Sequence, residues 1–274
     1  TDDNSGSDAN ARLTFTPTAS GTYYLGAERA GEDDVGTYDV RALDRSPPEL
    51  TPVPGEDFGP SSNYGASVDT ARLFVVALHG RGGNVPKIVN AVLDASPGDV
   101  AIYGAVPASG EGSWWGVGYL KPVLPTDSDL IASLEVVDDL IQYALDSGFS
   151  YDEIVIAGFS QGASLALEYA VRSPAEGGGA GRPFRAIVAM SGALLGSFTE
   201  DEADRYTTPI TNLNVYLGGY EGDRNVPLTY VERTEGFMVE SLGAPVTHHI
   251  EPGARHAISG YDVEVALTNA MAAA

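Results

Sequence analysis

The chain has 274 residues, of which 43% are hydrophobic, and a formal net charge of −23 at pH 7 from 38 acidic and 15 basic side chains. This charge disfavours nucleic acid and anionic membrane surfaces as partners, and fits either plain solubility or adaptation to salty water. The sequence contains no cysteine, which excludes disulfides, cysteine-based zinc sites and a cysteine nucleophile, and no apolar run approaches the roughly 18 residues of a membrane helix.

The first 70 residues differ in pattern from the rest. Between residues 11 and 43, the segments ARLTFTP, GTYYLGA and GTYDVRAL alternate apolar and polar residues and are separated by turn residues. Such alternation predicts short antiparallel strands, so we assign residues 1–45 to a small β segment. Residues 46–70 are dense in proline, glycine and serine and are predicted to form a connector along the surface.

Residues 71–274 show a different period and form the predicted catalytic domain. Short apolar runs, typical of strands buried on both faces, occur at Leu73–Leu78, Val100–Val106, Glu153–Ala157, Ala186–Met190 and Leu213–Leu217. Helix-like stretches lie between or after them at Ser128–Leu145, Ser164–Val171 and Pro227–Leu242. The alternation predicts an α/β fold with a mainly parallel central sheet covered by helices, whose chemistry gathers at the carboxyl ends of the strands.

A candidate nucleophile follows one of these strands. The pentapeptide GFSQG, residues 158–162, comes directly after EIVIA and before the helix-like ASLALEYAV. A nucleophile elbow requires this strand–turn–helix context, because small residues must flank a serine held in a tight turn. We therefore predict that Ser160 is a nucleophile rather than an ordinary serine of a surface turn.

A serine hydroxyl needs a base, which is usually histidine. Of the four histidines, His79 ends an earlier strand, whereas His248 and His249 lie in the strand-like PVTHHIEP and are expected to be hydrogen-bonded or exposed. His256 alone lies both late in the chain and on a loop after a strand, so we predict that it is the base.

The acid that orients the base should fall between nucleophile and base in the chain. The segment NVYLGGYEGDRNVPL offers Glu221 and Asp223, and position alone leaves both open. For the oxyanion, we expect main-chain N–H donors at Gln161 and at Arg81 of HGRGG. The Arg81 side chain faces either solvent or an acidic substrate group. No Gly-Lys-Ser/Thr follows HGRGG, which excludes a phosphate-binding loop.

Together, these motifs resemble the carboxylesterase/phospholipase family of α/β-hydrolases over residues 71–274. The corresponding segments read LHGRGGN, GFSQGAS, GYEGDRNVP and PGARHAIS. The resemblance selects Asp223 over Glu221, because the family's acid lies in a G-x-x-D-x-x-V-P box. It implies an α/β-hydrolase fold and the hydrolysis of carboxylic esters through an acyl-serine, with no metal or organic cofactor. Ala163 departs from the family, which usually has a second glycine there.

Two further expectations concern the substrate, a small-molecule or polymeric ester. Trp114 and Trp115, within residues 107–127, are predicted to wall the acyl pocket, the alternative being surface packing. Thioesterase and lysophospholipase activities remain alternatives, since the family contains both. A polymer-directed esterase and a non-catalytic binding protein of the same fold are further alternatives.

Residues 11–43 resemble the closing strands of the bacterial pre-peptidase C-terminal domain, an accessory of exported enzymes. The stretch that carries this resemblance is RLTFTPTASGTYYL, followed by GTYDV. The resemblance implies a secreted bacterial protein, located outside the cell or in the periplasm.

Overall fold

The structure, a computed structural model, describes residues 63–96, 99–108, 112–116, 128–174, 177–196, 206 and 208–272. The predicted β segment of residues 1–45, and the predicted connector up to residue 62, lie outside the described residues, so both stay predictions.

Within the described residues, seven strands form one sheet in the order β1-β3-β2-β4-β5-β6-β7. Their bounds are β1 Asn63–Gly65, β2 Leu73–Leu78, β3 Val100–Gly104, β4 Ile154–Phe159, β5 Ala186–Met190, β6 Val215–Tyr220 and β7 Val246–Glu251. β1 pairs with β3 in antiparallel orientation, and every other neighbouring pair is parallel. The predicted mainly parallel sheet is therefore confirmed.

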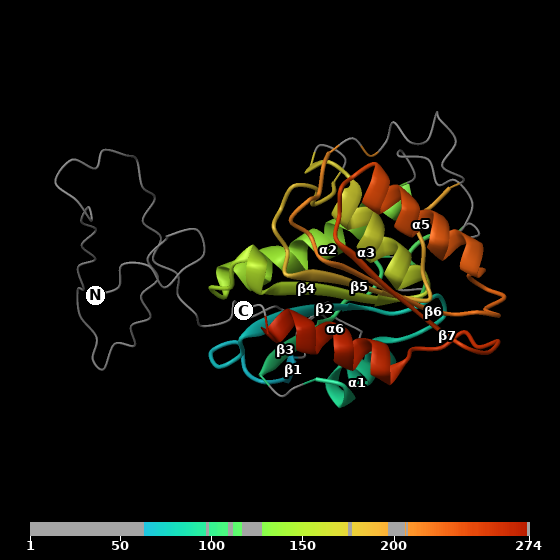
Figure 1. The fold of residues 1–274 in the computed structure, drawn as a ribbon. Helices are drawn as coiled ribbons and strands as arrows, with labels where there is room; N and C mark the ends of the chain where they lie inside the picture. The colour runs from blue at the N-terminus through green and yellow to red at the C-terminus, as the bar shows by residue number, and fades with distance from the viewer. Residues whose placement is uncertain are drawn as a thin grey trace, which may run out of the picture. The chain divides into compact units, whose positions relative to one another are not determined.

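Helices cover both faces of this sheet (Figure 1). α2 Ser128–Asp146, α3 Gln161–Val171 and α5 Leu228–Glu240 lie on one face, and α1 Val85–Asp94 and α6 Gly260–Ala272 lie on the other. A single turn of 3-10 helix, η2, spans Tyr151–Glu153. None of the helices in the described ranges is both long and apolar enough to cross a membrane.

The side chains of β2 point alternately into the two hydrophobic cores, one on each face of the sheet. Phe74, Val76 and Leu78 pack into the core under α2 and α3, whereas Leu73, Val75 and Ala77 pack into the core under α1 and α6. All six are fully buried, which is why this strand reads as a continuous apolar run.

Several elements differ from the sequence-based expectation. β1 lies in the predicted connector, and neither α1 nor α6 was predicted as a helix. α3 begins at Gln161, three residues before the predicted Ser164, because the helix starts directly after the turn at Ser160. β6 begins at Val215 rather than Leu213 and continues through Gly218 and Gly219 to Tyr220.

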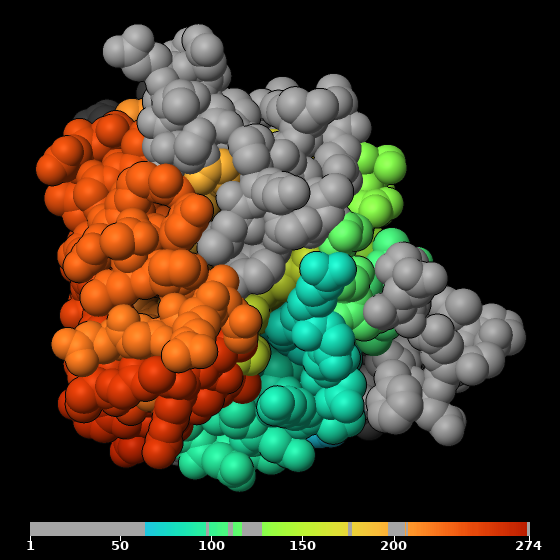
Figure 2. Space-filling view, turned by 90° about the vertical axis from the view of Figure 1, so that its right-hand side faces the viewer, coloured from blue at the N-terminus to red at the C-terminus, as the bar shows by residue number. Residues whose placement is uncertain are grey.

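Because the strands are parallel, β2, β4, β6 and β7 end at the same edge of the sheet. Figure 2 looks onto the side that lies at the right of Figure 1. There the orange-to-red segments that follow β6 and β7 lie beside the teal segment that follows β2.

Candidate active site

Ser160 occupies the turn between β4 and α3 in a strained conformation. Its backbone has φ 54° and ψ −117°, and Ser160 and Ser191 are the two non-glycine residues with positive φ in the described ranges. Such a conformation costs of order 1–3 kcal/mol and persists where the surroundings impose it. Here the surroundings are close: a Cβ added at Gly158 would lie 2.3 Å from the Gly162 carbonyl oxygen, and one at Gly162 would lie 2.2 Å from that of Leu78. The predicted tight turn is therefore present, with the small residues it requires.

The structure brings Ser160, His256 and Asp223 together in a chain of hydrogen bonds. His256 Nε2 lies 2.8 Å from Ser160 Oγ, and His256 Nδ1 lies 2.7 Å from Asp223 Oδ2. The Asp223 carboxylate accepts from Nδ1–H, which leaves Nε2 as the acceptor of the serine proton. Glu221, the alternative acid, is exposed and takes no part in these hydrogen bonds.

Asp223 is held by its own loop. Its Oδ1 accepts the main-chain N–H groups of Asn225 at 2.8 Å and Val226 at 3.1 Å, and its side chain is 1% exposed. The other carboxylate oxygen is thereby directed at His256. Both donors belong to the NVP segment, residues 225–227, that follows the acid in the sequence motif.

The loop that carries His256 is fastened to the ends of β6 and β7. Gly222 N donates to Gly253 O at 2.8 Å, and Ser259 Oγ donates to the carboxylate of Glu251. The imidazole of His256 also packs against the Phe159 ring, with centroids 4.9 Å apart. These contacts fix the imidazole beside the serine, although 20% of its side chain stays exposed.

The loop after β2 approaches Ser160 closely, as an oxyanion loop must. A Cβ added at Gly80 would lie 3.1 Å from Ser160 Cβ and 2.9 Å from the Phe159 ring. The main-chain N–H of Gln161 opens α3, directly after Ser160. Within the described residues, neither this N–H nor that of Arg81 has a hydrogen-bond partner, so both are available to an oxyanion.

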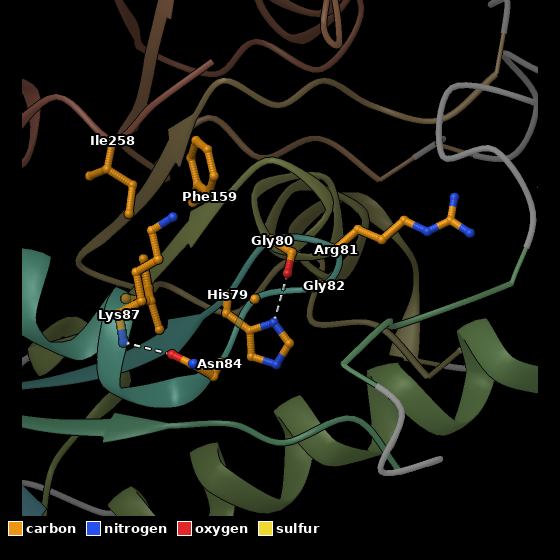
Figure 3. A pocket seen from close by; sticks show the side chains of 10 residues that line it. His79, Gly80, Arg81, Gly82, Asn84, Lys87, Phe159 and Ile258 are labelled. Atoms are coloured by element: carbon orange, nitrogen blue, oxygen red, sulfur yellow. Dashed lines mark hydrogen bonds between the residues drawn. The ribbon is translucent and has the colours of Figure 1, made fainter. Parts of the chain in front are cut away.

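His79 shapes that loop, a role that the sequence analysis missed. Its Nδ1–H donates to Gly80 O at 2.8 Å (Figure 3). Gly83 N donates to the same oxygen at 2.8 Å. Burial lowers the pKa of His79 below its usual 6.5, so the ring is neutral at pH 7. The Gly80 carbonyl is thus held by two donors of its own loop.

Gln161 and the two tryptophans form a buried hydrogen-bond network that contacts the loop after β2. The buried Gln161 amide accepts from Trp114 N at 3.1 Å and donates to Trp115 O at 3.0 Å, while Trp114 Nε1 donates to His79 O at 2.7 Å. Trp114 is 2% exposed and Trp115 is 1% exposed, and both belong to the hydrophobic core. The alternative of surface packing is therefore wrong, and the predicted acyl-pocket role stays a prediction.

A cavity of about 90 Å³ lies beside this loop. It is lined by residues 79–84, by Lys87 and Ile88 of α1, and by Phe159 and Ile258 (Figure 3). Phe159 directly precedes Ser160 in the chain, and Ile258 follows His256 by two residues. Neither tryptophan lines it. The Arg81 side chain points away from it, and Arg81 Nη2 lies 3.5 Å from Gly116 O.

The remaining histidines are hydrogen-bonded, as expected. His248 Nδ1 lies 2.7 Å from Glu235, and His249 Nδ1 lies 2.6 Å from Asp262, whose pKa is raised by burial. His249, Glu251 and Asp262 place one possible metal-ligand atom each within 4.8 Å of one another. These atoms already bond within the cluster or to Ser259, so their arrangement needs no ion to explain it.

Comparison with known proteins gives this geometry a family context. Residues 96–270, more than half of the chain, match the phospholipase/carboxylesterase family. A phospholipase/carboxylesterase from Dyadobacter fermentans is similar in structure, with 26% identity and a TM-score of 0.65 over 77% of this chain and 95% of that chain. A Bacillus cereus carboxylesterase, 17% identical, has a TM-score of 0.59 over 76% and 91% of the two chains. The predicted α/β-hydrolase fold is therefore confirmed.

One curated relative matches over a short stretch. Acyl-protein thioesterase 1 of Kluyveromyces lactis is 46% identical over 48 residues, which is 18% of this chain. The match spans about a fifth, 21%, of that relative's length.

Proposed function

Because the chain belongs to the phospholipase/carboxylesterase family, we propose that it is a serine carboxylesterase that cleaves esters through an acyl-serine intermediate. The single observation that carries this proposal is the hydrogen-bond chain from Ser160 through His256 to Asp223, with spacings of 2.8 and 2.7 Å. A strained serine, an imidazole base and an orienting carboxyl group in this order are what activates a hydroxyl for acyl transfer.

In the first half-reaction, His256 takes the proton of Ser160 as Oγ attacks the ester carbonyl carbon. The carbonyl oxygen becomes an oxyanion and accepts hydrogen bonds from the N–H groups of Arg81 and Gln161. Asp223 stabilises the imidazolium that forms. His256 then gives its proton to the leaving alkoxide oxygen, which departs as an alcohol and leaves the acyl group on Ser160.

In the second half-reaction, water replaces the alcohol. His256 takes a proton from the water, whose oxygen attacks the acyl carbon, and the same two N–H groups bind the second oxyanion. Collapse of this intermediate returns the proton to Ser160 Oγ and releases the carboxylic acid. The hydrolysis needs no redox partner, because water supplies both the proton and the hydroxyl group.

A thioesterase is the second candidate, and the short match to acyl-protein thioesterase 1 supports it. The same atoms would cleave a thioester, with a thiolate leaving in place of an alkoxide. Paired substrates separate the two: oxygen esters and thioesters with identical acyl chains from two to sixteen carbons. A carboxylesterase has the higher kcat/KM on the oxygen ester at its preferred chain length.

Variants of the two reacting side chains test the site itself. Ser160→Ala and His256→Ala should each lower kcat by about 10³-fold or more, and the double variant should be no worse, because the pair acts as a unit. His248→Ala, which removes a histidine bonded to Glu235, is the matched control and should cost little. An active His256→Ala variant, beside an inactive His248→Ala variant, would overturn the assignment of the base.

We also propose that the protein is exported. The resemblance of residues 11–43 to an accessory domain of exported enzymes supports an extracellular or periplasmic location. Fractionation of producing cells tests it, and activity confined to the cytoplasm would contradict it.

A further inference from the structure

The basic side chains are unevenly distributed over the described part of the chain. Five of them, all exposed, have no carboxylate partner within ion-pair distance among the described residues: Arg72, Arg81, Lys87, Arg224 and Arg255. Arg72 precedes β2, whereas the other four follow strands whose carboxyl ends form the candidate site. Arg224 adjoins Asp223, and Arg255 adjoins His256.

The overall charge makes this distribution informative. With a net charge of −23, the average field of the protein repels anions. Cations left unpaired at one edge of such a protein make that edge the place where a negative group is least repelled. Unpaired cations that border a catalytic cleft raise the local concentration of anionic substrates.

The cavity beside the oxyanion loop gives one of these cations a defined position. Lys87 lines the cavity, and its ammonium group is directed toward Phe159 and Ile258 (Figure 3). Arg81 lines the same cavity with its loop, but its guanidinium points away. Lys87 is therefore the cation that a group in the cavity would meet.

The position of the cavity indicates which part of an ester it receives. In the mechanism above, His256 delivers its proton to the leaving oxygen, so the alcohol part departs on the histidine side. Phe159 packs against the His256 ring at 4.9 Å, and Ile258 follows His256 by two residues. Because both line the cavity, we assign it to the alcohol side. Its volume of about 90 Å³ is enough for a compact oxyanion.

We propose that this cavity is a subsite for a compact anionic group, a carboxylate or a phosphate, on the alcohol part of the ester, and that Lys87 binds it. This inference rests on the proposed esterase function and makes its substrates esters of small hydroxy acids or hydroxyalkyl phosphates.

Three small acetyl esters test the subsite. The acetyl ester of glycolate carries a carboxylate, the acetyl ester of glycolamide replaces it with a neutral amide of nearly the same size, and the acetyl ester of 2-hydroxyethyl phosphate carries a phosphate. The wild-type protein should show a kcat/KM about tenfold higher on at least one anionic ester than on the glycolamide ester, the size expected for one charge-assisted hydrogen bond. The better anionic ester identifies the group.

Two variants assign the preference to Lys87. Lys87→Gln should lower the ratio of anionic to neutral kcat/KM about tenfold, and Lys87→Glu should lower it further. Arg72→Gln is the matched control, because Arg72 is an exposed cation that precedes β2 and so lies at the opposite end of that strand. It should leave the ratio unchanged.

Equal kcat/KM values for the three esters, or a wild-type ratio in Lys87→Gln, would overturn the subsite while leaving the esterase intact. A Lys87-dependent preference for a carboxylate on the acyl side, seen with monomethyl succinate against its amide, would contradict the alcohol-side assignment. Failure of the proposed function looks different: then no ester, including nitrophenyl acetate, is hydrolysed faster by the wild type than by Ser160→Ala.

Discussion

Gly80→Ala tests how closely the oxyanion loop must approach the serine. The added methyl carbon would lie 2.9 Å from Phe159 Cδ1, 3.1 Å from Ser160 Cβ and 3.3 Å from Phe159 Cε1. Ordinary contacts begin near 3.4 Å, so the loop or the Phe159 ring must move by about half an ångström. Either movement disturbs catalysis, since the loop carries the Arg81 N–H and the ring supports His256.

The size of the effect follows from the cost of losing an oxyanion donor, about 10²–10³ in kcat. A displaced donor loses most of that stabilisation, so we expect kcat to fall about a hundredfold, equivalent to about 2.7 kcal/mol in the activation barrier. KM should change far less, because the donor acts mainly in the transition state. Overpacking should lower the free energy of unfolding by only about 1–3 kcal/mol, which leaves the protein folded.

The assay is steady-state hydrolysis of nitrophenyl acetate, with circular dichroism as the check on folding. Gly236→Ala is the matched control: this glycine lies within α5, and nothing stands within 4 Å of the added Cβ. It should keep full activity and raise the free energy of unfolding by about 0.5–1 kcal/mol. A folded Gly80→Ala variant whose kcat stays within threefold of the wild type would refute the reasoning.

Three further predictions follow from burial and charge. Because burial lowers the pKa of His79, the native state resists a proton that the unfolded chain binds, so stability is lost as pH falls below about 6.5. The melting temperature should therefore fall less steeply between pH 7.5 and pH 5 in His79→Asn than in the wild type. Equal slopes for the two proteins would contradict this. Glu168→Gln removes the negative charge that lies 2.8 Å from the buried Arg172, and should lower the free energy of unfolding in urea by about 3 kcal/mol. The matched control Glu240→Gln, at an exposed position, should lower it by less than about 0.5 kcal/mol, and equally small losses for both variants would count against a stabilising role of the pair. Finally, the melting temperature should rise from 0.01 M to 1 M NaCl, because the screening length of the repulsion between acidic side chains falls from about 30 Å to about 3 Å. A flat or falling melting temperature would contradict the interpretation of the net charge as an adaptation to salty water.

The sequence predicted the sheet well because its strands are buried on both faces. Leu73–Leu78 and Ala186–Met190 match their strands residue for residue. β1 was missed, since its three residues NYG lie in a segment rich in turn formers and become a strand only by pairing with β3. The end of β6 was also missed, because consecutive glycines do not resemble a strand; Gly218 is required there by Asp262, whose Oδ2 would lie 2.6 Å from an added Cβ.

A readable signal existed for α1, which the sequence analysis did not single out. Val85, Ile88, Val89 and Val92 are buried at helical spacing, and the Asn84 side chain caps the helix by accepting from Lys87 N at 3.1 Å. The start of α3 carried no such signal, because it depends on the strained backbone of Ser160 rather than on a capping side chain.

At the site, chain order and local context were enough to name Ser160 and His256, whereas the choice of Asp223 over Glu221 needed the resemblance to the family's acid motif. The structure brings all three within hydrogen-bond distance. The supporting layer was not predictable in this way. Gln161 bonds to main-chain groups 46 and 47 residues away, so its side-chain role depends on tertiary packing. The same holds for Trp114, whose indole reaches a carbonyl 35 residues away.

The most direct test of the central proposal is covalent labelling of the nucleophile. A fluorophosphonate reacts with an activated serine and forms a stable adduct that mass spectrometry locates on a peptide. We predict one labelled residue, Ser160, with no labelling of Ser160→Ala and labelling of His256→Ala slowed by about 10³-fold or more, because the hydroxyl then lacks its base. A label on another serine, or a Ser160→Ala variant that keeps a tenth of wild-type esterase activity, would contradict the proposal.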